Sequence, residues 1–168
     1  FIEKKLPAFQ AANQSVIVTI AGFSIKEFIL LAKKLEIANG IDALELDFAC
    51  PHSKDSYGTI CKDEYLTEKT VAQVKEVYSK PVIVKLSPSV TDITKIAQSA
   101  QKGGADILSL INTVSAMAID ITTKRPVLGN KVGGLSGPAI KPIALKAVWD
   151  VAHAVDLPII GIGEISNS

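Results

Sequence analysis

Several kinds of residue and segment are scarce in this chain of 168 residues, and each scarcity excludes a class of protein. The only two cysteines, Cys50 and Cys61, are too few for a disulfide framework, and their spacing is not that of a zinc site. The only two histidines are His52 and His153, so a histidine-based metal site is not expected and the metal prediction is none. No run of about 18 apolar residues occurs, which argues against a membrane-spanning helix.

An excess of one charge is also lacking, because 18 Lys and Arg face 17 Asp and Glu and the net charge is +1. A nucleic-acid-binding surface needs a basic excess, so no such partner is expected. Residues 1–5 lack the charged-then-apolar pattern of a secretory signal, and unpaired cysteines favour a cytoplasmic location. The apolar share of 48% and the charged share of 21% are ordinary for a globular domain, which excludes disorder.

Short apolar runs alternate with amphipathic segments along the chain. The runs at residues 15–21, 43–49, 81–86, 106–111 and 158–162 predict five buried strands. Helices are predicted to begin near Ser24, Thr67, Asp92 and Pro138. Ser24 and Glu27 have the spacing of a capping box, and Pro138 suits the first position of a helix. Residues 112–137 predict a long glycine-rich excursion with a hairpin around residues 118–127.

Five strands separated by helices predict an α/β fold with a parallel sheet and right-handed crossovers. An open doubly wound sheet and a (β/α)8 barrel both satisfy this pattern. A barrel typically takes about 250 residues, so this chain would supply five of its strands. Periodicity leaves both architectures open.

Polar and small residues gather where the predicted strands end, which is where both architectures bind ligands. In chain order they are Thr19, Asp47, Cys50, Pro51, His52, Lys85, Asn112, Thr113, Gly133, Gly134, Ser136, Gly137, Gly161 and Gly163. A lysine inside a strand buried on both faces is costly unless it is paired. Lys85 is therefore interpreted as a cation for an anionic ligand or a reduced cofactor, with a plain strand-end charge as the alternative.

Two further features favour a ligand site. Cys50 precedes Pro51 at the start of a polar loop, which favours a reactive thiol, whereas Cys61 is interpreted as a small buried apolar residue. The GGLSG run at residues 133–137 is either a flexible turn or a nest of backbone N–H groups that leads into a helix and suits a phosphate.

Five blocks of the sequence, in order, resemble dihydroorotate dehydrogenases. They are LDFACPH at 46–52, PVIVKLSPSVTDI at 81–93, LSLINTVSAMAIDI at 108–121, KVGGLSGPAIKPIAL at 131–145 and PIIGIGEI at 158–165. The resemblance is greatest to the soluble, NAD-linked class, whose catalytic subunit works with an iron–sulfur flavoprotein subunit. It implies a (β/α)8 TIM barrel of which this chain supplies about strands 3 to 7. Residues 1–168 would then form a single, incomplete FMN-binding domain.

The resemblance implies FMN-dependent oxidation of dihydroorotate to orotate in de novo pyrimidine biosynthesis. Cys50 matches the general base for the C5 proton, while the flavin takes the C6 hydride. The implied FMN contacts are Thr19, Asp47, Lys85, Ile111, Gly137, Gly163 and Glu164, and the implied substrate contacts are Asp47, Asn112 and Thr113. FAD and an iron–sulfur cluster would lie only on a partner subunit, and a homodimer is the expected core of the assembly.

Three positions depart from the family pattern. Thr19 and Asp47 stand where the family has asparagine, and Glu164 stands where it has the second glycine of a pair. Residues 50–52 also resemble dihydropyrimidine dehydrogenases, so reduction of uracil or thymine is an alternative. A catalytically silent barrel that serves as a binding or assembly subunit is a second alternative, which Asp47 and Glu164 favour.

Overall fold

A computed structural model of the chain describes residues 1–22, 24–48 and 60–164. The expectations for Cys50, Pro51 and His52 lie outside these residues. The elements are α1 (Leu6–Ala11), β1 (Ile17–Ile20), α2 (Ile25–Glu36), β2 (Ala43–Asp47), α4 (Glu64–Lys75), β3 (Val82–Leu86), α5 (Ile93–Lys102), β4 (Ile107–Leu110), β5 (Val114–Ala116), β6 (Ile119–Asp120), β7 (Arg125–Pro126), β8 (Gly133–Leu135), the 3-10 helix η1 (Pro138–Ile140), α6 (Lys141–Ala152) and β9 (Ile159–Gly161).

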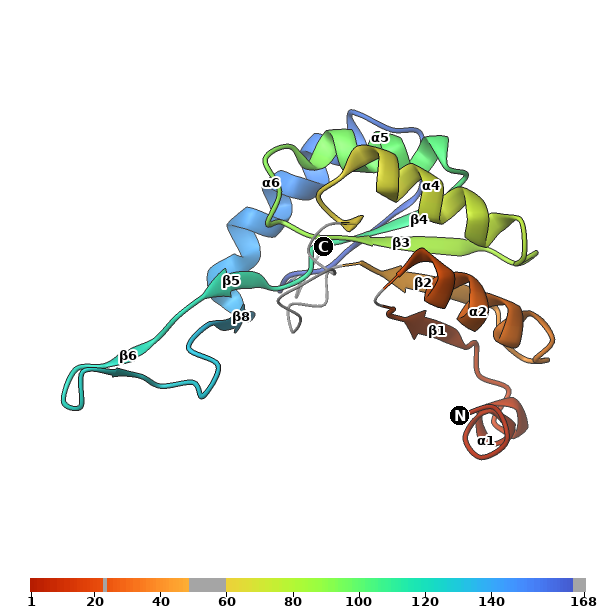
Figure 1. Cartoon of the computed structure of the whole chain (residues 1–168), viewed down its shortest axis with the longest axis horizontal. Coiled ribbons are helices and arrows are strands. Elements are labelled where there is room, and N and C mark those ends of the chain that lie inside the picture. Colours follow the sequence, from red (N-terminus) through yellow and green to blue (C-terminus); the bar gives the residue numbers. More distant parts are fainter. Residues whose placement is uncertain (23, 49–59, 165–168) are drawn as a thin grey trace.

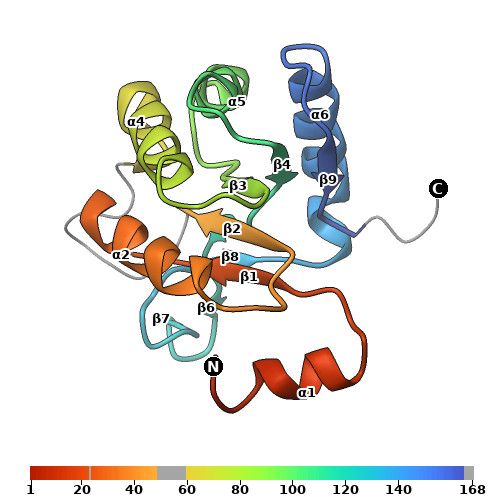
Figure 2. The same ribbon diagram turned by 90° about the vertical axis from the view of Figure 1, so that its right-hand side faces the viewer.

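The five predicted strands form one parallel sheet in the order β1-β2-β3-β4-β9. Helices α2, α4, α5 and α6 lie along the outer, convex side of this curved sheet (Figures 1 and 2). Every crossover between neighbouring strands therefore passes over the same face, as in a (β/α)8 barrel and unlike a doubly wound sheet. The sheet is a sector of a TIM barrel.

The two faces of the sheet differ in chemistry because successive side chains of a strand point to opposite sides. Leu44, Leu46, Val84 and Leu108 are fully buried and belong to the same apolar cluster as Phe28 of α2. Full burial of one such side chain stabilises the fold by roughly 1.5–3 kcal/mol. The opposite face carries polar side chains, described below.

Three helices, α2, α4 and α5, begin at side-chain caps. Ser24 Oγ accepts a hydrogen bond from the Glu27 N–H at 3.4 Å, which confirms the predicted cap of α2. Asp92 Oδ1 accepts from the Thr94 N–H at 3.0 Å at the start of α5. The helix expected from Thr67 begins at Glu64 instead, because Asp63 Oδ1 accepts from the Leu66 N–H at 2.8 Å and starts the helix one turn earlier.

Two aspartates join neighbouring strands at their amino-terminal ends, which lie at the other edge of the sheet from the predicted site. Asp42, just before β2, accepts a hydrogen bond from the Val16 N–H at 2.7 Å. Asp106, just before β4, accepts one from the Val82 N–H at 2.7 Å and pairs with Lys75 of α4 at 2.8 Å. These contacts fix the relative height of neighbouring strands, and so of the residues at their carboxyl ends.

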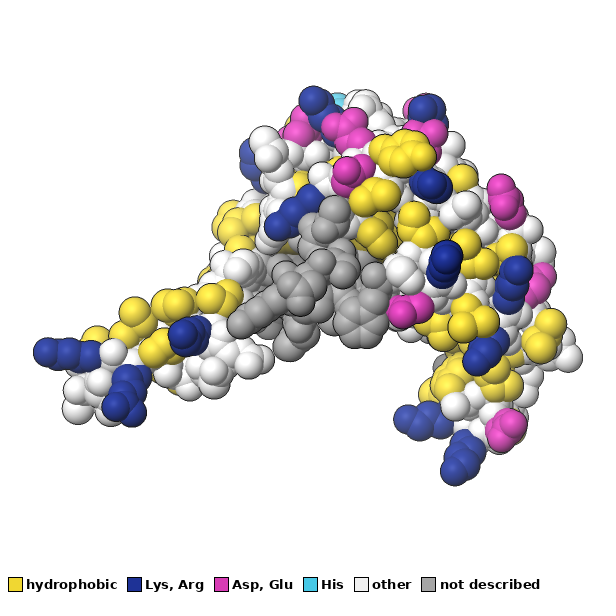
Figure 3. Space-filling view, in the orientation of Figure 1, with side chains coloured by type: hydrophobic (Ala, Val, Ile, Leu, Met, Phe, Trp, Pro, Cys, Tyr) yellow, Lys and Arg dark blue, Asp and Glu magenta, His cyan; other side chains and the backbone are white. Residues whose placement is uncertain are grey.

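An extended arm leaves the sheet after β4. Strand β5 pairs with β8 and β6 pairs with β7, both antiparallel, and the β6–β7 pair confirms the predicted hairpin. The arm projects from the body in Figure 1, and Figure 3 shows apolar and basic side chains along it. In the described part of the chain, no helix has the length and apolar character needed to cross a membrane.

Candidate active site

Three predicted site residues come together on the face of the sheet that the helices leave uncovered. In the strand register Thr19 lies opposite Glu45, and Lys85 lies between Asp47 and Ser109. Residues two apart in a strand, or opposite in register, share a face. These five side chains therefore form one polar surface, the inner face, across β1 to β4. It lies toward the carboxyl ends of the strands, where barrel enzymes place their catalytic residues.

Two members of the inner face were not found from the sequence. Glu45 accepts a hydrogen bond from Thr19 Oγ1 and another from Ser109 Oγ, each at 2.7 Å. Ser109 is fully buried. The available signal was period-two alternation, because Glu45 stands two residues before Asp47 and so shares its face.

The three predicted contacts after β4 lie at the sheet's carboxyl edge. The Ile111 N–H donates to the Ile162 carbonyl at 3.0 Å, so a backbone contact from Ile111 to a ligand would use its carbonyl oxygen. The Asn112 N–H donates to the Leu86 carbonyl at 3.1 Å, and Asn112 Oδ1 accepts from the Thr113 N–H at 2.8 Å. These bonds hold Asn112 beside the end of β3.

The glycine-rich run at residues 133–137 contains a strand, which neither sequence interpretation predicted. Gly133–Leu135 forms strand β8 rather than a turn or a nest. A Cβ at Gly134 would lie 2.2 Å from Thr113 Oγ1, so only glycine lets β8 pass this close to Thr113. Gly137 has φ +88° and precedes η1, where no side chain of the described residues caps the N-terminus. Pro138 has no N–H, and the Ile140 N–H donates to the Gly137 carbonyl at 3.1 Å, so Ala139 is the η1 residue whose N–H could face an anion.

The end of β9 brings the last two predicted residues to the start of α6. Gly163 has φ +136°, and a Cβ there would lie 2.4 Å from the Cβ of Ala144 in α6. Glu164 has φ +59°, in the left-handed region that favours glycine. Both residues thus have a positive φ, which suits glycine, although the second residue is glutamate.

Cys61, the cysteine that the structure describes, has the environment predicted for it. Cys61 is buried, and burial raises the pKa of its thiol, which keeps it protonated near neutral pH. The interpretation of Cys61 as a small apolar residue is confirmed. Within residues 1–22, 24–48 and 60–164, no three His, Cys, Asp or Glu side chains form a group able to hold a metal ion.

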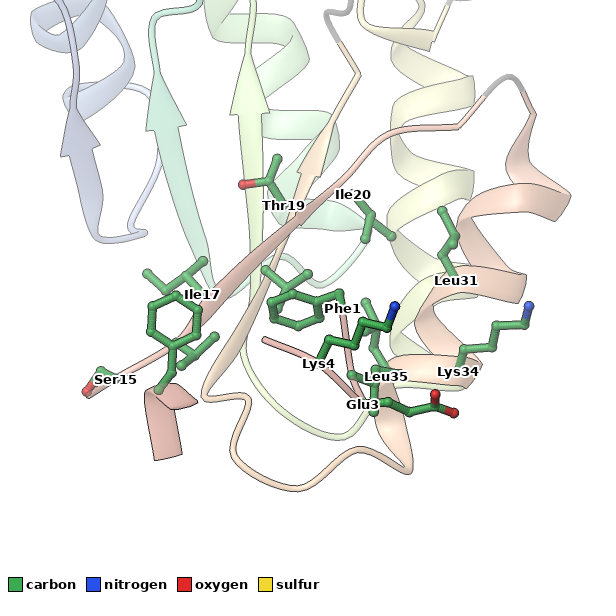
Figure 4. Close-up of a pocket in the computed structure, with 14 residues that line it drawn as sticks. Phe1, Glu3, Lys4, Ser15, Ile17, Thr19, Ile20, Leu31, Lys34 and Leu35 are labelled. Atoms are coloured by element: carbon green, nitrogen blue, oxygen red, sulfur yellow. The ribbon is translucent and has the colours of Figure 1, made fainter. Parts of the chain in front are cut away.

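A cavity lies away from these residues. A space of about 850 Å³ opens between α1, β1 and α2 and is lined mostly by apolar side chains, including Phe1, Ile17, Leu31 and Leu35 (Figure 4). Of the predicted site residues that the structure describes, only Thr19 borders it. Its walls also carry Glu3, Lys4 and Lys34, but the inner face brings together three of the predicted site residues and is therefore the better candidate.

The family model for dihydroorotate dehydrogenase matches residues 2–168. The chain belongs to the dihydroorotate dehydrogenase family. A protein of Alkaliphilus metalliredigens (strain QYMF) named "Dihydroorotate dehydrogenase B (NAD(+)), catalytic subunit" is 50% identical over 167 residues, which is 98% of this chain and 54% of that protein. A Pyrococcus horikoshii protein of the same name is 54% identical over 152 residues, covering 90% of this chain and 50% of that protein.

The chain thus spans about half the length of the curated relatives it matches. Among solved structures, a putative deoxyribose-phosphate aldolase from Toxoplasma gondii ME49 has a TM-score of 0.49 and 24% identity, covering 69% of this chain and 45% of that one. This likeness is too low to inform function.

Proposed function

We propose that the complete protein carrying this chain is an FMN-dependent dihydroorotate dehydrogenase of pyrimidine biosynthesis, with the inner face and the adjoining carboxyl-end loops as its site. The observation that carries the proposal is Lys85, which stands among hydrogen-bond acceptors on the inner face of a barrel sector. Membership of the dihydroorotate dehydrogenase family supports it. Barrel enzymes build their sites at this edge from several strands at once.

The residues present fit FMN at both of its ends. Lys85 supplies a cation on the inner face, where it would attract the electron-rich end of a flavin ring. Gly137 offers open backbone at the start of η1, because a Cβ there would meet no described atom within 4 Å, and this suits a phosphate. Gly163 lies against Ala144 of α6 and would contribute its backbone alone. When bound, FMN would supply a two-electron acceptor for the hydride that leaves C6 of the substrate.

Thr19 has a narrower role in this scheme than the asparagine of the family. Its single hydroxyl hydrogen is donated to Glu45. The remaining lone pairs can only accept, so Thr19 would receive a hydrogen bond from a ring N–H of the ligand.

Asn112 and Thr113 would bind the pyrimidine of the substrate. A carboxamide both donates and accepts, which matches the alternating N–H and C=O groups of a pyrimidine edge. The bonds that fix Asn112 to β3 and to the Thr113 N–H orient this amide before a ligand arrives. Fixed polar groups lose less conformational freedom on binding.

Cys50 would remove the C5 proton of dihydroorotate. It lies outside the described residues, and its assignment rests on its place in the LDFACPH block. A thiol normally ionises at a pKa of about 8.5, so a base that works near pH 7 needs a lowered pKa or a closed, dry site. Cys61 is buried with a raised pKa and is the poorer base.

One observation favours the dihydropyrimidine alternative. An ionised Asp47 can only accept hydrogen bonds, and it would repel the carboxylate of orotate but not neutral dihydrouracil. Lys85 lies directly opposite Asp47 in the register and would offset part of this repulsion. We therefore keep dihydroorotate as the proposed substrate.

The proposal extends to partners and location. The relatives are named as catalytic subunits of an NAD(+)-linked enzyme. We propose an iron–sulfur flavoprotein partner that carries FAD and passes electrons to NAD, a homodimeric core, and a cytoplasmic location.

The test is a pair of cysteine variants in the complete protein. Cys50→Ala should slow flavin reduction by dihydroorotate by roughly 10²–10⁴-fold, the usual contribution of a general base, and should leave FMN bound. Cys61→Ala is the matched control and should reduce flavin at nearly the parent rate. Near-parent reduction by Cys50→Ala would remove Cys50 from the mechanism.

A further inference from the structure

Glu45 joins three strands of the inner face through one carboxylate. Thr19 Oγ1 on β1 donates to Oε2, and Ser109 Oγ on β4 donates to Oε1, both at 2.7 Å. Strand β3 lies between β2 and β4 in the sheet, so the Glu45 side chain must cross β3 to reach Ser109.

The crossing point lies next to Lys85. On β3, Ile83 stands opposite Glu45 and Lys85 stands opposite Ser109. A side chain that runs from Glu45 to Ser109 therefore passes over the step between Ile83 and Lys85. Its negative charge lies on the amino-terminal side of Lys85, toward the interior of the barrel.

The two hydrogen bonds also fix where the hydroxyl protons point. Each hydroxyl has one hydrogen, and both hydrogens are directed to Glu45. Thr19 and Ser109 therefore present only lone pairs to other groups. Of the five side chains of the inner face, Lys85 is therefore the only cation, and it is surrounded by groups that accept hydrogen bonds.

We propose that Glu45 is a positioning residue of the FMN site that holds Thr19 and Ser109 as acceptors and offsets the positive charge of Lys85. This inference rests on the proposed function. The carboxylate acts through its neighbours and through its field rather than by touching the reacting atoms. A negative charge close to a bound flavin would disfavour its anionic reduced form, so Glu45 would lower the midpoint potential that Lys85 would raise.

The decisive variant is Glu45→Gln in the complete protein, because glutamine keeps the shape and removes the charge. Reduced FMN should gain about tenfold in affinity relative to oxidised FMN, which for a two-electron couple is a rise of about 30 mV in midpoint potential. The potential is measured by anaerobic reductive titration against a reference dye. A purely structural role would change stability or FMN content without moving the potential.

Glu36→Gln is the matched control. Glu36 also accepts two hydrogen bonds, from the Ser79 N–H at 3.1 Å and Ser79 Oγ at 2.6 Å, but it ends α2 and lies outside the inner face. This variant should keep the parent's flavin potential. Retained FMN with an unchanged potential in Glu45→Gln would overturn the inference and leave the proposed function standing. A complete parent protein that binds no FMN would overturn both.

A second measurement needs no cofactor. Thr19→Val and Ser109→Ala are each made in the parent and in the Glu45→Gln background, and stability is measured by urea unfolding. If Glu45 is the common acceptor, each change should cost more stability in the parent than in the Gln background. Strictly additive losses would contradict the shared acceptor, even where Glu45→Gln retains FMN too weakly for a potential.

Discussion

Gly163 at the end of β9 lies in direct contact with Ala144 of α6. A Cβ atom added at Gly163 would be 2.4 Å from the Cβ of Ala144, well inside the distance that two carbon atoms tolerate. The residue also has φ +136°, which a side chain disfavours. Space and backbone conformation both require glycine at this junction of strand and helix.

Gly163→Ala should therefore reduce the free energy of unfolding by about 1–3 kcal/mol, the usual range for overpacking a tight contact. Urea denaturation measures the change. Gly129→Ala is the control, because a Cβ there meets no described atom within 4 Å. Equal stability of the two variants would show that α6 moves away from β9 at little cost.

Glu164→Gly should stabilise the protein. The left-handed conformation at φ +59° costs a residue with a side chain roughly 1–2 kcal/mol, and glycine avoids that cost. Glycine also makes the unfolded chain more flexible, so we expect a net gain of about 0.5–1 kcal/mol in thermal or urea unfolding. Asn13→Gly, at φ +50°, is the comparison and should gain less, since asparagine tolerates this region. A loss of stability in Glu164→Gly would indicate that the glutamate side chain makes a stabilising contact.

Tyr78→Phe should raise the free energy of unfolding by about 1 kcal/mol, because a buried hydroxyl without a partner costs about that much. Tyr78 is 1% exposed, and its hydroxyl finds no hydrogen-bond partner among the described residues. Tyr65→Phe, at an exposed position, is the control and should change little.

The same hydroxyl predicts a pH dependence. Burial, with smaller contributions from Glu36 and Asp42, raises the pKa of Tyr78 to about 12, against about 10 in the unfolded chain. The folded state therefore stays protonated where the unfolded state begins to ionise, and stability is lost as pH rises from about 10 to 12. The parent should lose more stability across this window than Tyr78→Phe. Parallel loss in both proteins would mean that Tyr78 ionises equally in the two states.

Asp47→Asn should tighten orotate binding in the complete protein. Two charges about 4 Å apart interact by roughly 4 kcal/mol at an effective dielectric of 20, so even a partial relief of repulsion is measurable. Orotate affinity is read from the change in flavin absorbance. Asp106→Asn, at the amino-terminal end of β4, is the control and should leave the affinity unchanged. Equal affinity of parent and Asp47→Asn would place Asp47 away from the ligand.

Much of the architecture was predictable because apolar periodicity is a local property. The five strands, the cap at Ser24 and the hairpin in the arm follow from it, and the structure confirms them. Periodicity could not predict the barrel, because it is the same for open and closed parallel sheets. That choice came from the resemblance and agrees with the placement of the helices on one side of the sheet.

The inner face shows where sequence reasoning stops. Lys85 and Asp47 were found because a charge in an apolar strand is conspicuous. Alternation with Asp47 could have placed Glu45 on this face, but its hydrogen bond to Ser109 spans strands β2 to β4 and has no local sequence signature. The β5–β8 pairing of the glycine-rich run was likewise missed, since it joins segments about 20 residues apart.

Anaerobic addition of dihydroorotate to the complete protein loaded with FMN tests the central claim most directly. We predict that dihydroorotate bleaches the flavin absorbance and yields one orotate per flavin reduced, whereas dihydrouracil leaves the absorbance unchanged. Bleaching by dihydrouracil with no response to dihydroorotate would establish the dihydropyrimidine alternative, and no response to either would contradict the proposed activity altogether.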